Sequence, residues 1–258
     1  LGLIFFSAAG LLALLRWAES GMRWRWMIVS AVSCGLALGT KYNGLITFFL
    51  LSALVPFLAA RSCRRAGSGA LARGIGWTAA FFILSLAVFS PWMIRNVRWT
   101  GNPIYPLYDG VFRSLSPSGK TQAQEAGTAA AAGEPSQGLN HFVARRLVFG
   151  ESALETFTIP IRIFFQGEDD DPKYFDGRLN PGLLFFSVLA FFGTAALGKR
   201  ERTERLVLAG FSLFYLLYTF FTVDMRIRYV GPILVPLAIL SVYGMRQAVR
   251  LLEGRCRL

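Results

Sequence analysis

Apolar residues in this chain occur in long continuous blocks separated by short polar connections. A helix needs roughly 20 apolar residues to cross the ~30 Å hydrocarbon core of a bilayer. The blocks approach or reach that length, and the second, which is short, can be extended through the membrane interface by Trp24 and Trp26. The pattern therefore predicts an all-α integral membrane protein with about seven transmembrane helices. The predicted helices lie at residues 1–15, 26–40, 44–60, 75–94, 179–197, 206–223 and 229–249.

The first block begins at Leu1, inside an apolar run, without Met and without a charged leader. A multi-pass protein normally enters its first span from a polar segment. We therefore expect the first helix to be truncated and residues upstream of Leu1 to be missing.

The composition is typical of a membrane protein, and the net positive charge has to be interpreted in that setting. Hydrophobic residues make up 54% of the 258 residues, and the mean hydropathy is +0.47. The formal net charge of +12 would suggest nucleic acid in a soluble protein. Here the basic residues lie mainly between apolar blocks, without an aromatic-interleaved basic groove. This placement argues against a nucleic-acid partner.

The placement of Lys and Arg predicts the orientation of the helices. Positive charge in short loops stays on the cytoplasmic side of a membrane, whereas long loops are translocated regardless of charge. Basic residues concentrate in the connections at 16–25, 61–73, 199–205 and 246–257. The short connections on the other side carry only Lys41, Arg226 and Arg228. Seven alternating helices then place the carboxy terminus in the cytoplasm and residues 95–178 outside.

The organisation follows as three parts. Residues 1–94 hold the first four transmembrane helices, 95–178 form the external, periplasmic loop, and 179–258 hold the last three helices and a cytoplasmic tail. Within the loop, residues 114–138 lack large apolar side chains and are expected to be mobile. Residues 139–165 have helical spacing and predict one interfacial helix, which Pro160 should end or kink.

Ionisable residues at the outer ends of helices are the best candidates for function, because a charge near hydrocarbon is costly unless a partner or a task retains it. They are Lys41 in "GTKYNG", Arg95 in "PWMIRN", and Arg226 with Arg228 in "DMRIRYVGP". Guanidinium groups suit bidentate binding of phosphate oxygens. The alternatives are that Lys41 only snorkels to the interface, and that Asp224 and lipid phosphate neutralise the two arginines.

Other candidates are weaker. Glu168 and the three following aspartates could bind a divalent cation, but their spacing fits no recognised metal loop, and a solvated charge run is favoured. The candidate metal ligands are Asp169, Asp170 and Asp171. His141 is the only histidine and is interpreted as structural. No cofactor is required on this reading. The cysteines predict neither zinc nor a disulfide; they are Cys34, Cys63 and Cys256.

Three segments resemble bacterial GT-C membrane glycosyltransferases, in the order found in that group. They are "GLALGTKYNGLITFFLL", "PWMIRNVRWTGNPIYPLY" and "RIRYVGPILVPLAIL". The group includes protein O-mannosyltransferases and the aminoarabinose transferase that acts on lipid A. The resemblance implies a bacterial inner-membrane enzyme that takes a sugar from a polyprenyl phosphate at the outer face, with inversion at the anomeric carbon. The acidic general base of the family lies in the first outer loop and is expected upstream of Leu1.

By motif position, the resemblance assigns the cationic residues to the donor phosphate, where preorganised positive charge stabilises the leaving group. The implied phosphate-binding residues are Lys41, Arg226, Arg228 and Tyr229. The residues implied to shape the cavity are Tyr42, Arg95, Asn96, Asn102 and Tyr105. Two other classes stay open: a non-catalytic membrane scaffold or assembly subunit, and a transporter. A transporter would ordinarily have broken helices or charges near mid-span, which these blocks almost lack.

Overall fold

The protein is mainly helical in the residues that its computed structural model describes, which are 1–62, 70–115, 141–192, 197–223 and 225–255. No strand occurs in these ranges. The all-α class predicted from the apolar blocks is therefore confirmed. The longer helices are α1 (Gly2–Glu19), α2 (Trp24–Thr40), α3 (Gly44–Ser62), α4 (Ala70–Thr100), α11 (Lys199–Thr222) and α13 (Leu234–Arg255). The shorter ones are α5 (Asp109–Leu115), α7 (His141–Phe149), α8 (Ala153–Phe157), α9 (Ile159–Arg162), η3 (Pro172–Tyr174), α10 (Pro181–Leu189), α12 (Ile227–Val230) and η5 (Gly231–Ile233).

Five of the helices are long and apolar enough to cross a membrane, so the prediction of a multi-pass protein is confirmed. They are Gly2–Glu19, Gly44–Arg61, Ala72–Thr100, Lys199–Thr222 and Ile227–Glu253. The predicted count of seven is not confirmed. Helix α2 has 17 residues, and α10, which begins the block at 179–197, ends at Leu189.

Helices α1 to α4 pack as a bundle joined by buried hydroxyl groups. Ser7 on α1 and Thr47 on α3 share a hydrogen bond of 2.8 Å. Ser30 on α2 donates to the Gly10 carbonyl at 2.7 Å, and Ser85 on α4 donates to the Ala31 carbonyl at 3.1 Å. Hydroxyl groups between apolar helices supply specific contacts where lipid offers no hydrophobic drive for association.

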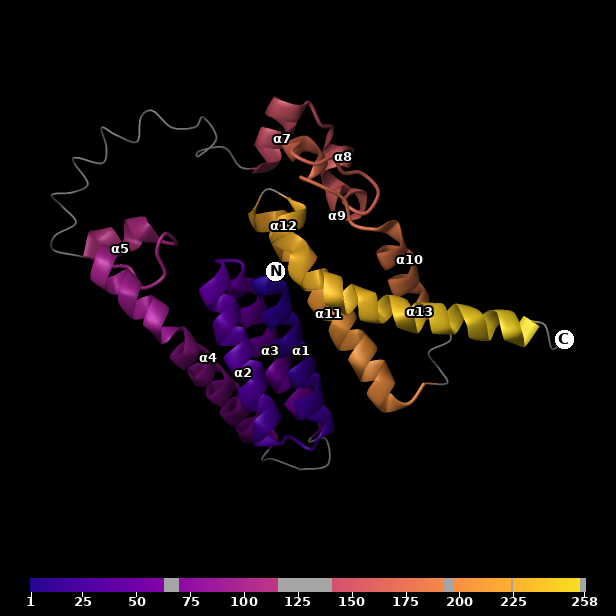
Figure 1. Ribbon diagram of the computed structural model, residues 1–258, viewed down its shortest axis with the longest axis horizontal. Helices are drawn as coiled ribbons and strands as arrows, with labels where there is room; N and C mark the ends of the chain where they lie inside the picture. The colour runs from indigo at the N-terminus through magenta and orange to yellow at the C-terminus, as the bar shows by residue number, and fades with distance from the viewer. Residues whose placement is uncertain (63–69, 116–140, 193–196, 224, 256–258) are drawn as a thin grey trace.

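The carboxy-terminal helices form a second group against this bundle. Helix α10 packs on α13, where Ser187 donates to the Leu237 carbonyl at 3.2 Å. Helix α11 contacts both α3 and α13, while η5 lies against α1. Arg200 at the start of α11 donates to Glu19 at the end of α1, with an Nε–Oε1 distance of 2.7 Å. In Figure 1, α4 extends from the bundle to the upper left, and α13 extends to the right.

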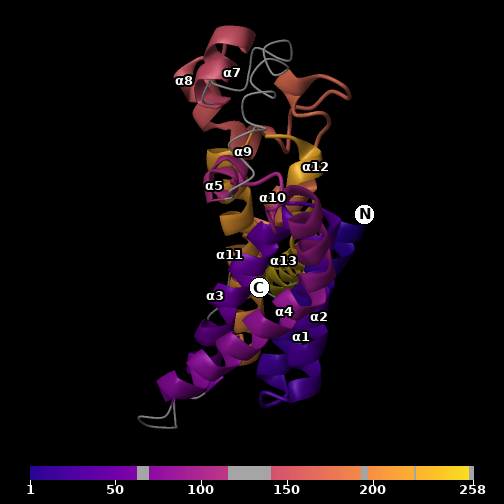
Figure 2. The same cartoon turned by 90° about the vertical axis from the view of Figure 1, so that its left-hand side faces the viewer.

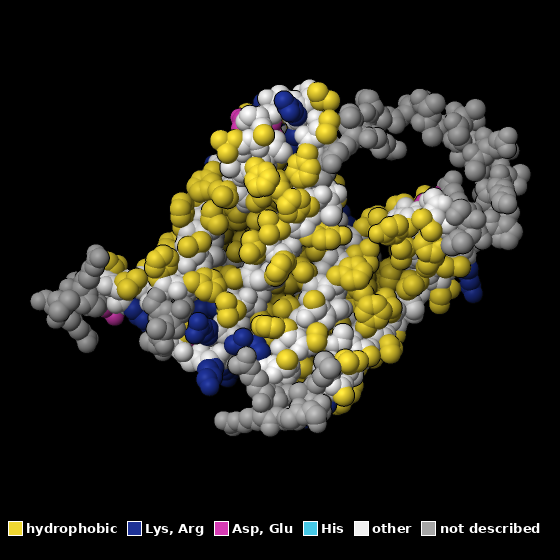
Figure 3. Space-filling model, turned by 180° about the vertical axis from the view of Figure 1, so that it is seen from behind, with side chains coloured by type: hydrophobic (Ala, Val, Ile, Leu, Met, Phe, Trp, Pro, Cys, Tyr) yellow, Lys and Arg dark blue, Asp and Glu magenta, His cyan; other side chains and the backbone are white. Residues whose placement is uncertain are grey.

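The two ends of the molecule differ in what they carry. In Figure 1 the turn between α2 and α3 lies at the upper end of the α1–α4 bundle, on the side that faces α5, α7–α9 and α12. The starts of α2 and α11 lie at the lower end. Figure 3 shows hydrophobic side chains across the middle of one face and Lys and Arg side chains gathered toward its lower edge. The turn at Lys41 and helix α12 thus lie toward one end, and the starts of α2 and α11 lie toward the other, whereas the carboxy-terminal end of α13 lies at mid-height on the right of Figure 1.

The predicted single interfacial helix at 139–165 is wrong, because the segment forms three short helices. Helix α7 stops at Gly150, which has a φ of +66° and so lies in the left-handed region that favours glycine. Ser152 and Glu155 then form a capping box that starts α8, and the hydrogen bonds from Ser152 lower the pKa of the Glu155 carboxyl. Pro160 lies in the first turn of α9 and begins a helix, which its missing N–H permits.

A buried ion-pair network holds these short helices together. Arg145 donates to Glu151, with an Nε–Oε2 distance of 2.8 Å, and their side chains are 2% and 1% exposed. Arg162 approaches the same carboxylate at 3.1 Å. The Arg145 and Arg162 guanidinium groups both lie near the ring of the fully buried Phe175. Figure 2 shows α7 and α8 above α12. The ion-pair network therefore stabilises residues 141–162, which lie above α12.

Candidate functional site

Lys41 lies in the short turn that joins α2 to α3. Its own backbone is extended, with φ −163° and ψ 152°, and its carbonyl accepts from the Gly44 N–H at 2.8 Å. Gly44 lies directly against the Ala37 carbonyl, where a Cβ would collide. Glycine at this position therefore allows α3 to begin close to the end of α2 and fixes where Lys41 is presented.

The turn is attached to the carboxy-terminal helices through Asn43. The Asn43 carbonyl accepts from the Tyr215 hydroxyl of α11 at 3.3 Å, and Asn43 Nδ2 donates to the Tyr229 carbonyl of α12 at 3.4 Å. Tyr215 is fully buried. Two segments that are nearly two hundred residues apart in the chain are thus held side by side.

This contact brings Lys41 together with Arg228 across one aromatic ring. The Lys41 ammonium lies 4.5 Å from the centroid of the Tyr229 ring, and the Arg228 guanidinium carbon lies 5.4 Å from it. Both distances are within the range of cation–π attraction. Tyr229, itself one of the residues implied to bind the donor phosphate, is thus in contact with two of the cations in that set.

The third cation, Arg226, joins the group through Asp176. Arg226 donates to Asp176 Oδ2 at 3.1 Å, and Arg228 approaches the same oxygen at 3.6 Å. We call Lys41, Arg226, Arg228 and Asp176 the charged cluster. With three positive charges and one negative, its formal charge is +2. It is a place where an additional anion would be attracted.

Asp176 was not found from the sequence, which offered Asp224 as the acidic partner of these arginines. Asp224 lies outside the described residues, as do Cys63, Cys256 and residues 116–138 of the expected mobile segment. Asp176 reaches the arginines because the neighbouring Phe175 carbonyl accepts from the Ile227 N–H at 2.9 Å. No local pattern in "YFDG" indicates a pairing across 50 residues.

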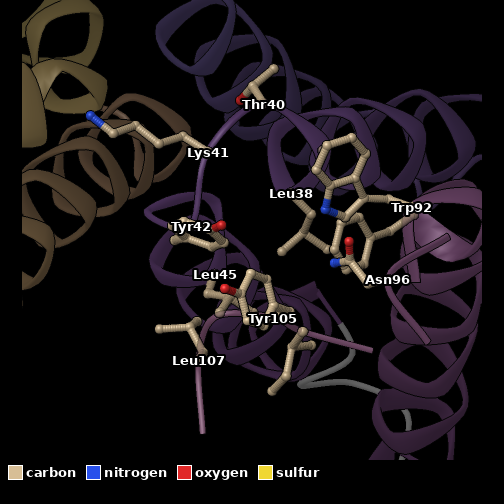
Figure 4. A pocket seen from close by; sticks show the side chains of 12 residues that line it. Leu38, Thr40, Lys41, Tyr42, Leu45, Trp92, Asn96, Tyr105 and Leu107 are labelled. Carbon is tan, nitrogen blue, oxygen red and sulfur yellow. The ribbon is translucent and has the colours of Figure 1, made fainter. Parts of the chain in front are cut away.

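A cavity of about 190 Å³ lies beside the Lys41 turn, between α2, α3 and α4 and the chain that follows α4. Three of the predicted cavity residues line it, and they are Tyr42, Asn96 and Tyr105. Trp92 and Phe89 on α4 complete an aromatic wall that sequence reasoning did not single out. Lys41 also borders the cavity, but Figure 4 shows its ammonium directed away, toward the carboxy-terminal helices. The cavity and the charged cluster therefore lie on two sides of one residue.

The cavity wall at 102–107 is held in place by two asparagines. Fully buried Asn102 accepts from the Ile104 N–H at 3.0 Å and donates to the Leu107 carbonyl at 2.9 Å. Asn96 Nδ2 donates to the Pro103 carbonyl at 3.3 Å. Asn102 therefore shapes the loop without lining the cavity itself, whereas Asn96 does both.

Arg95 lies outside the cavity and braces its wall. Its guanidinium carbon is 5.1 Å from the Trp92 ring centroid and 4.1 Å from that of Trp99. Trp92 lines the cavity and Trp99 does not. The contact of Arg95 with the site thus passes through Trp92.

The acidic run gives no support to a metal site. Asp171 caps η3 by accepting from the Lys173 N–H at 2.8 Å, and Asp170 has a φ of +62°, which turns the chain. In the described parts of the chain, no group of three or more His, Cys, Asp or Glu side chains could hold a metal ion. His141 is the first residue of α7.

The fold and the site together define a multi-pass helical membrane protein with a cationic cluster and an aromatic cavity at one end of its bundle. Residues 2–99 match the family described as dolichyl-phosphate-mannose-protein mannosyltransferase. A 55-residue stretch is 40% identical to protein O-mannosyl-transferase 1 of Danio rerio; it covers 20% of this chain and 8% of that relative. No solved structure matches the chain.

These matches agree with the resemblance of the sequence to GT-C membrane glycosyltransferases. The family match includes Lys41, Tyr42, Arg95 and Asn96, and ends before Asn102 and Tyr105. Arg226, Arg228 and Tyr229 lie beyond it.

Proposed function

We propose that this chain is part of a membrane glycosyltransferase that takes a sugar from a polyprenyl phosphate at the outer face of the membrane. The observation that carries the proposal is the contact of Lys41 and Arg228 with the one ring of Tyr229. Lys41 and Arg228 come from distant parts of the chain, and two cations that only mark the membrane interface would not be expected to share one ring. A site for a lipid phosphate has to gather its cations within reach of one anion.

The charged cluster supports the donor assignment through the chemistry of the leaving group. When a sugar leaves a polyprenyl phosphate, the phosphate gains negative charge at the bond that breaks. Cations already held in place stabilise that charge without reorganising during the reaction. Lys41 and Arg228 supply them from two different parts of the chain, while Arg226 is hydrogen-bonded to Asp176.

An apolar groove supports a lipid-linked donor. It has a volume of about 650 Å³ and lies between α9, α10, α11 and α13. Its lining includes Phe164, Phe191 and Ile233, with Ser187 and Ser212 among a mainly aliphatic and aromatic set. Ile233 ends η5, which follows α12 directly, so a lipid whose phosphate lies at Arg228 would have apolar surface nearby for its chain.

The family's printed description supports the choice of donor, since it names a dolichyl-phosphate mannose and a protein acceptor. We extend only the donor class to this chain: a sugar on a polyprenyl phosphate. An acidic residue that activates the acceptor is expected outside this sequence. We further propose that the carboxy terminus faces the cytoplasm of a bacterial inner membrane.

The test measures binding of polyprenyl phosphate to the full-length protein in lipid nanodiscs. Arg228→Ala should weaken binding about tenfold, the lower end for a charge-assisted hydrogen bond, because the Arg228 side chain is 56% exposed. Arg228→Lys should restore part of the affinity, since it keeps the charge and loses the planar fork. Lys41→Ala should weaken binding in the same way.

Arg98→Ala is the matched control, because Arg98 is an exposed arginine at the same end of the bundle and outside the charged cluster. Unchanged affinity in both Arg228→Ala and Lys41→Ala would reject the donor site. It would favour the scaffold interpretation, in which the cluster only fastens helices together.

A further inference from the structure

We infer that the cavity lined by Trp92, Asn96 and Tyr105 binds a single sugar ring. This inference rests on the proposed function and adds where the saccharide lies. The volume of about 190 Å³ is below the roughly 300–1,000 Å³ of pockets for drug-sized ligands. It is therefore suited to a small ligand such as one pyranose, rather than to an oligosaccharide or a nucleotide sugar.

The walls of the cavity match the two kinds of surface that a pyranose presents. A pyranose has an apolar C–H face and a rim of hydroxyl groups. Trp92, Tyr42 and Tyr105 offer aromatic faces for the first, and each also has a polar tip that can hydrogen-bond a hydroxyl. These three side chains are 40%, 47% and 39% exposed, so their rings remain accessible to a ligand.

Asn96 supplies a fixed polar group at the inner part of the same wall. It is 9% exposed, and its Nδ2 atom is held by the Pro103 carbonyl, which leaves Oδ1 as its acceptor for a ligand hydroxyl. Figure 4 shows the side chains of Trp92 and Asn96 directed toward the same space, opposite Tyr42 and Tyr105. An acyl chain would gain nothing from this amide, whereas a sugar hydroxyl would.

The position of the cavity fits a sugar that is attached to a phosphate. Lys41 borders the cavity while its ammonium lies over Tyr229, beside Arg228. A neutral ring in the cavity and an anion at the charged cluster would therefore lie on either side of the Lys41 turn. This order, ring and then phosphate, is the order of groups in a sugar joined to a polyprenyl phosphate.

The experiment compares two probes on the full-length protein in nanodiscs: polyprenyl-phosphate mannose and bare polyprenyl phosphate. The wild type should bind the sugar-bearing probe about tenfold more tightly, an advantage that hydrogen bonds and ring contact can supply. Trp92→Leu and Asn96→Ala should each remove most of this preference and leave the affinity for bare polyprenyl phosphate unchanged. Trp92→Phe should keep part of the preference, because it retains an aromatic face.

Trp99→Leu is the matched control, since Trp99 also contacts Arg95 on α4 but does not line the cavity. A preference that persists in Trp92→Leu and Asn96→Ala would overturn the inference. So would equal binding of the two probes by the wild type, which would leave the polyprenyl-phosphate proposal standing. Failure of the wild type to bind either probe would overturn both.

Discussion

The Asp176 carboxylate and the Arg226 guanidinium form a 3.1 Å ion pair between residues 50 positions apart in the chain. The same oxygen lies 3.6 Å from Arg228. Asp176 therefore occupies a position beside the cations where an external anion would also bind. The Asp176 carboxylate and the phosphate of a ligand would compete for Arg228.

Replacing Asp176 with Asn should tighten the binding of polyprenyl phosphate. The change raises the formal charge of the cluster by one and removes the competing carboxylate. A partly exposed charge contributes up to about 1 kcal/mol, so we expect roughly a two- to fivefold gain in affinity. The gain should shrink as salt is raised, because salt screens exposed charges. Asp170→Asn is the control, and weaker binding in Asp176→Asn would show that this carboxylate mainly holds the site together.

Replacing Glu151 with Gln should loosen the short helices α7 to α9. Glu151 pairs with Arg145 and Arg162, and removing one partner of a buried ion pair leaves uncompensated charge at a cost of about 3–5 kcal/mol. Hydrogen exchange should become faster across residues 141–162 while α1 to α3 keep their protection. Glu168 is exposed, so Glu168→Gln should change neither the exchange rate across residues 141–162 nor the protection of α1 to α3. Wild-type protection in Glu151→Gln would mean that the aromatic contacts around Phe175 are sufficient.

Replacing Gly44 with Ala should displace the turn that presents Lys41. The new Cβ would meet the Ala37 carbonyl, and forcing a side chain into a packed site typically costs about 1–3 kcal/mol. We expect lower thermal stability together with weaker binding of polyprenyl phosphate. Gly210→Ala on α11 is the control, because a Cβ there meets open space. Equal behaviour of the two variants would show that the turn tolerates movement.

The orientation predicted from the basic connections can be tested with impermeant thiol reagents in intact cells. In a cysteine-free background, Leu154→Cys should react from outside, because Leu154 is 75% exposed on α8. Arg202→Cys, at the start of α11, should react only after the membrane is permeabilised. The reverse labelling pattern would invert the topology and place the charged cluster in the cytoplasm.

Apolar block length predicts most of the helices here because it is a local property of the sequence. The cationic candidates could also be named from sequence, since charges at helix ends near hydrocarbon are unusual. What local pattern could not give is the partner of each charge. Arg205 illustrates this: counted among the loop cations, it is only 2% exposed, and its guanidinium binds the Ala190 carbonyl and Glu201.

The aromatic wall was missed for a similar reason. Trp92 lies in an apolar block. The sequence alone does not distinguish a tryptophan that faces lipid from one that faces another helix or a cavity. Only the packing of α2 against α4 and the fold of residues 102–107 decide that it lines a cavity. Asn102 was expected to shape the cavity. It does not line it, but its hydrogen bonds to Ile104 and Leu107 hold the loop that forms one cavity wall.

The double attachment of Asn43 makes the site sensitive to the lateral position of α11. This residue binds Tyr215 on α11 and the backbone of Tyr229 on α12, while Lys41, two residues earlier, depends on the same turn for its place over the ring. A sideways shift of α11 within the bilayer would move the turn and separate Lys41 from Arg228. Bilayer thickness and lateral pressure, which act on helix positions, would thereby alter the attraction for an anion without touching any charged residue.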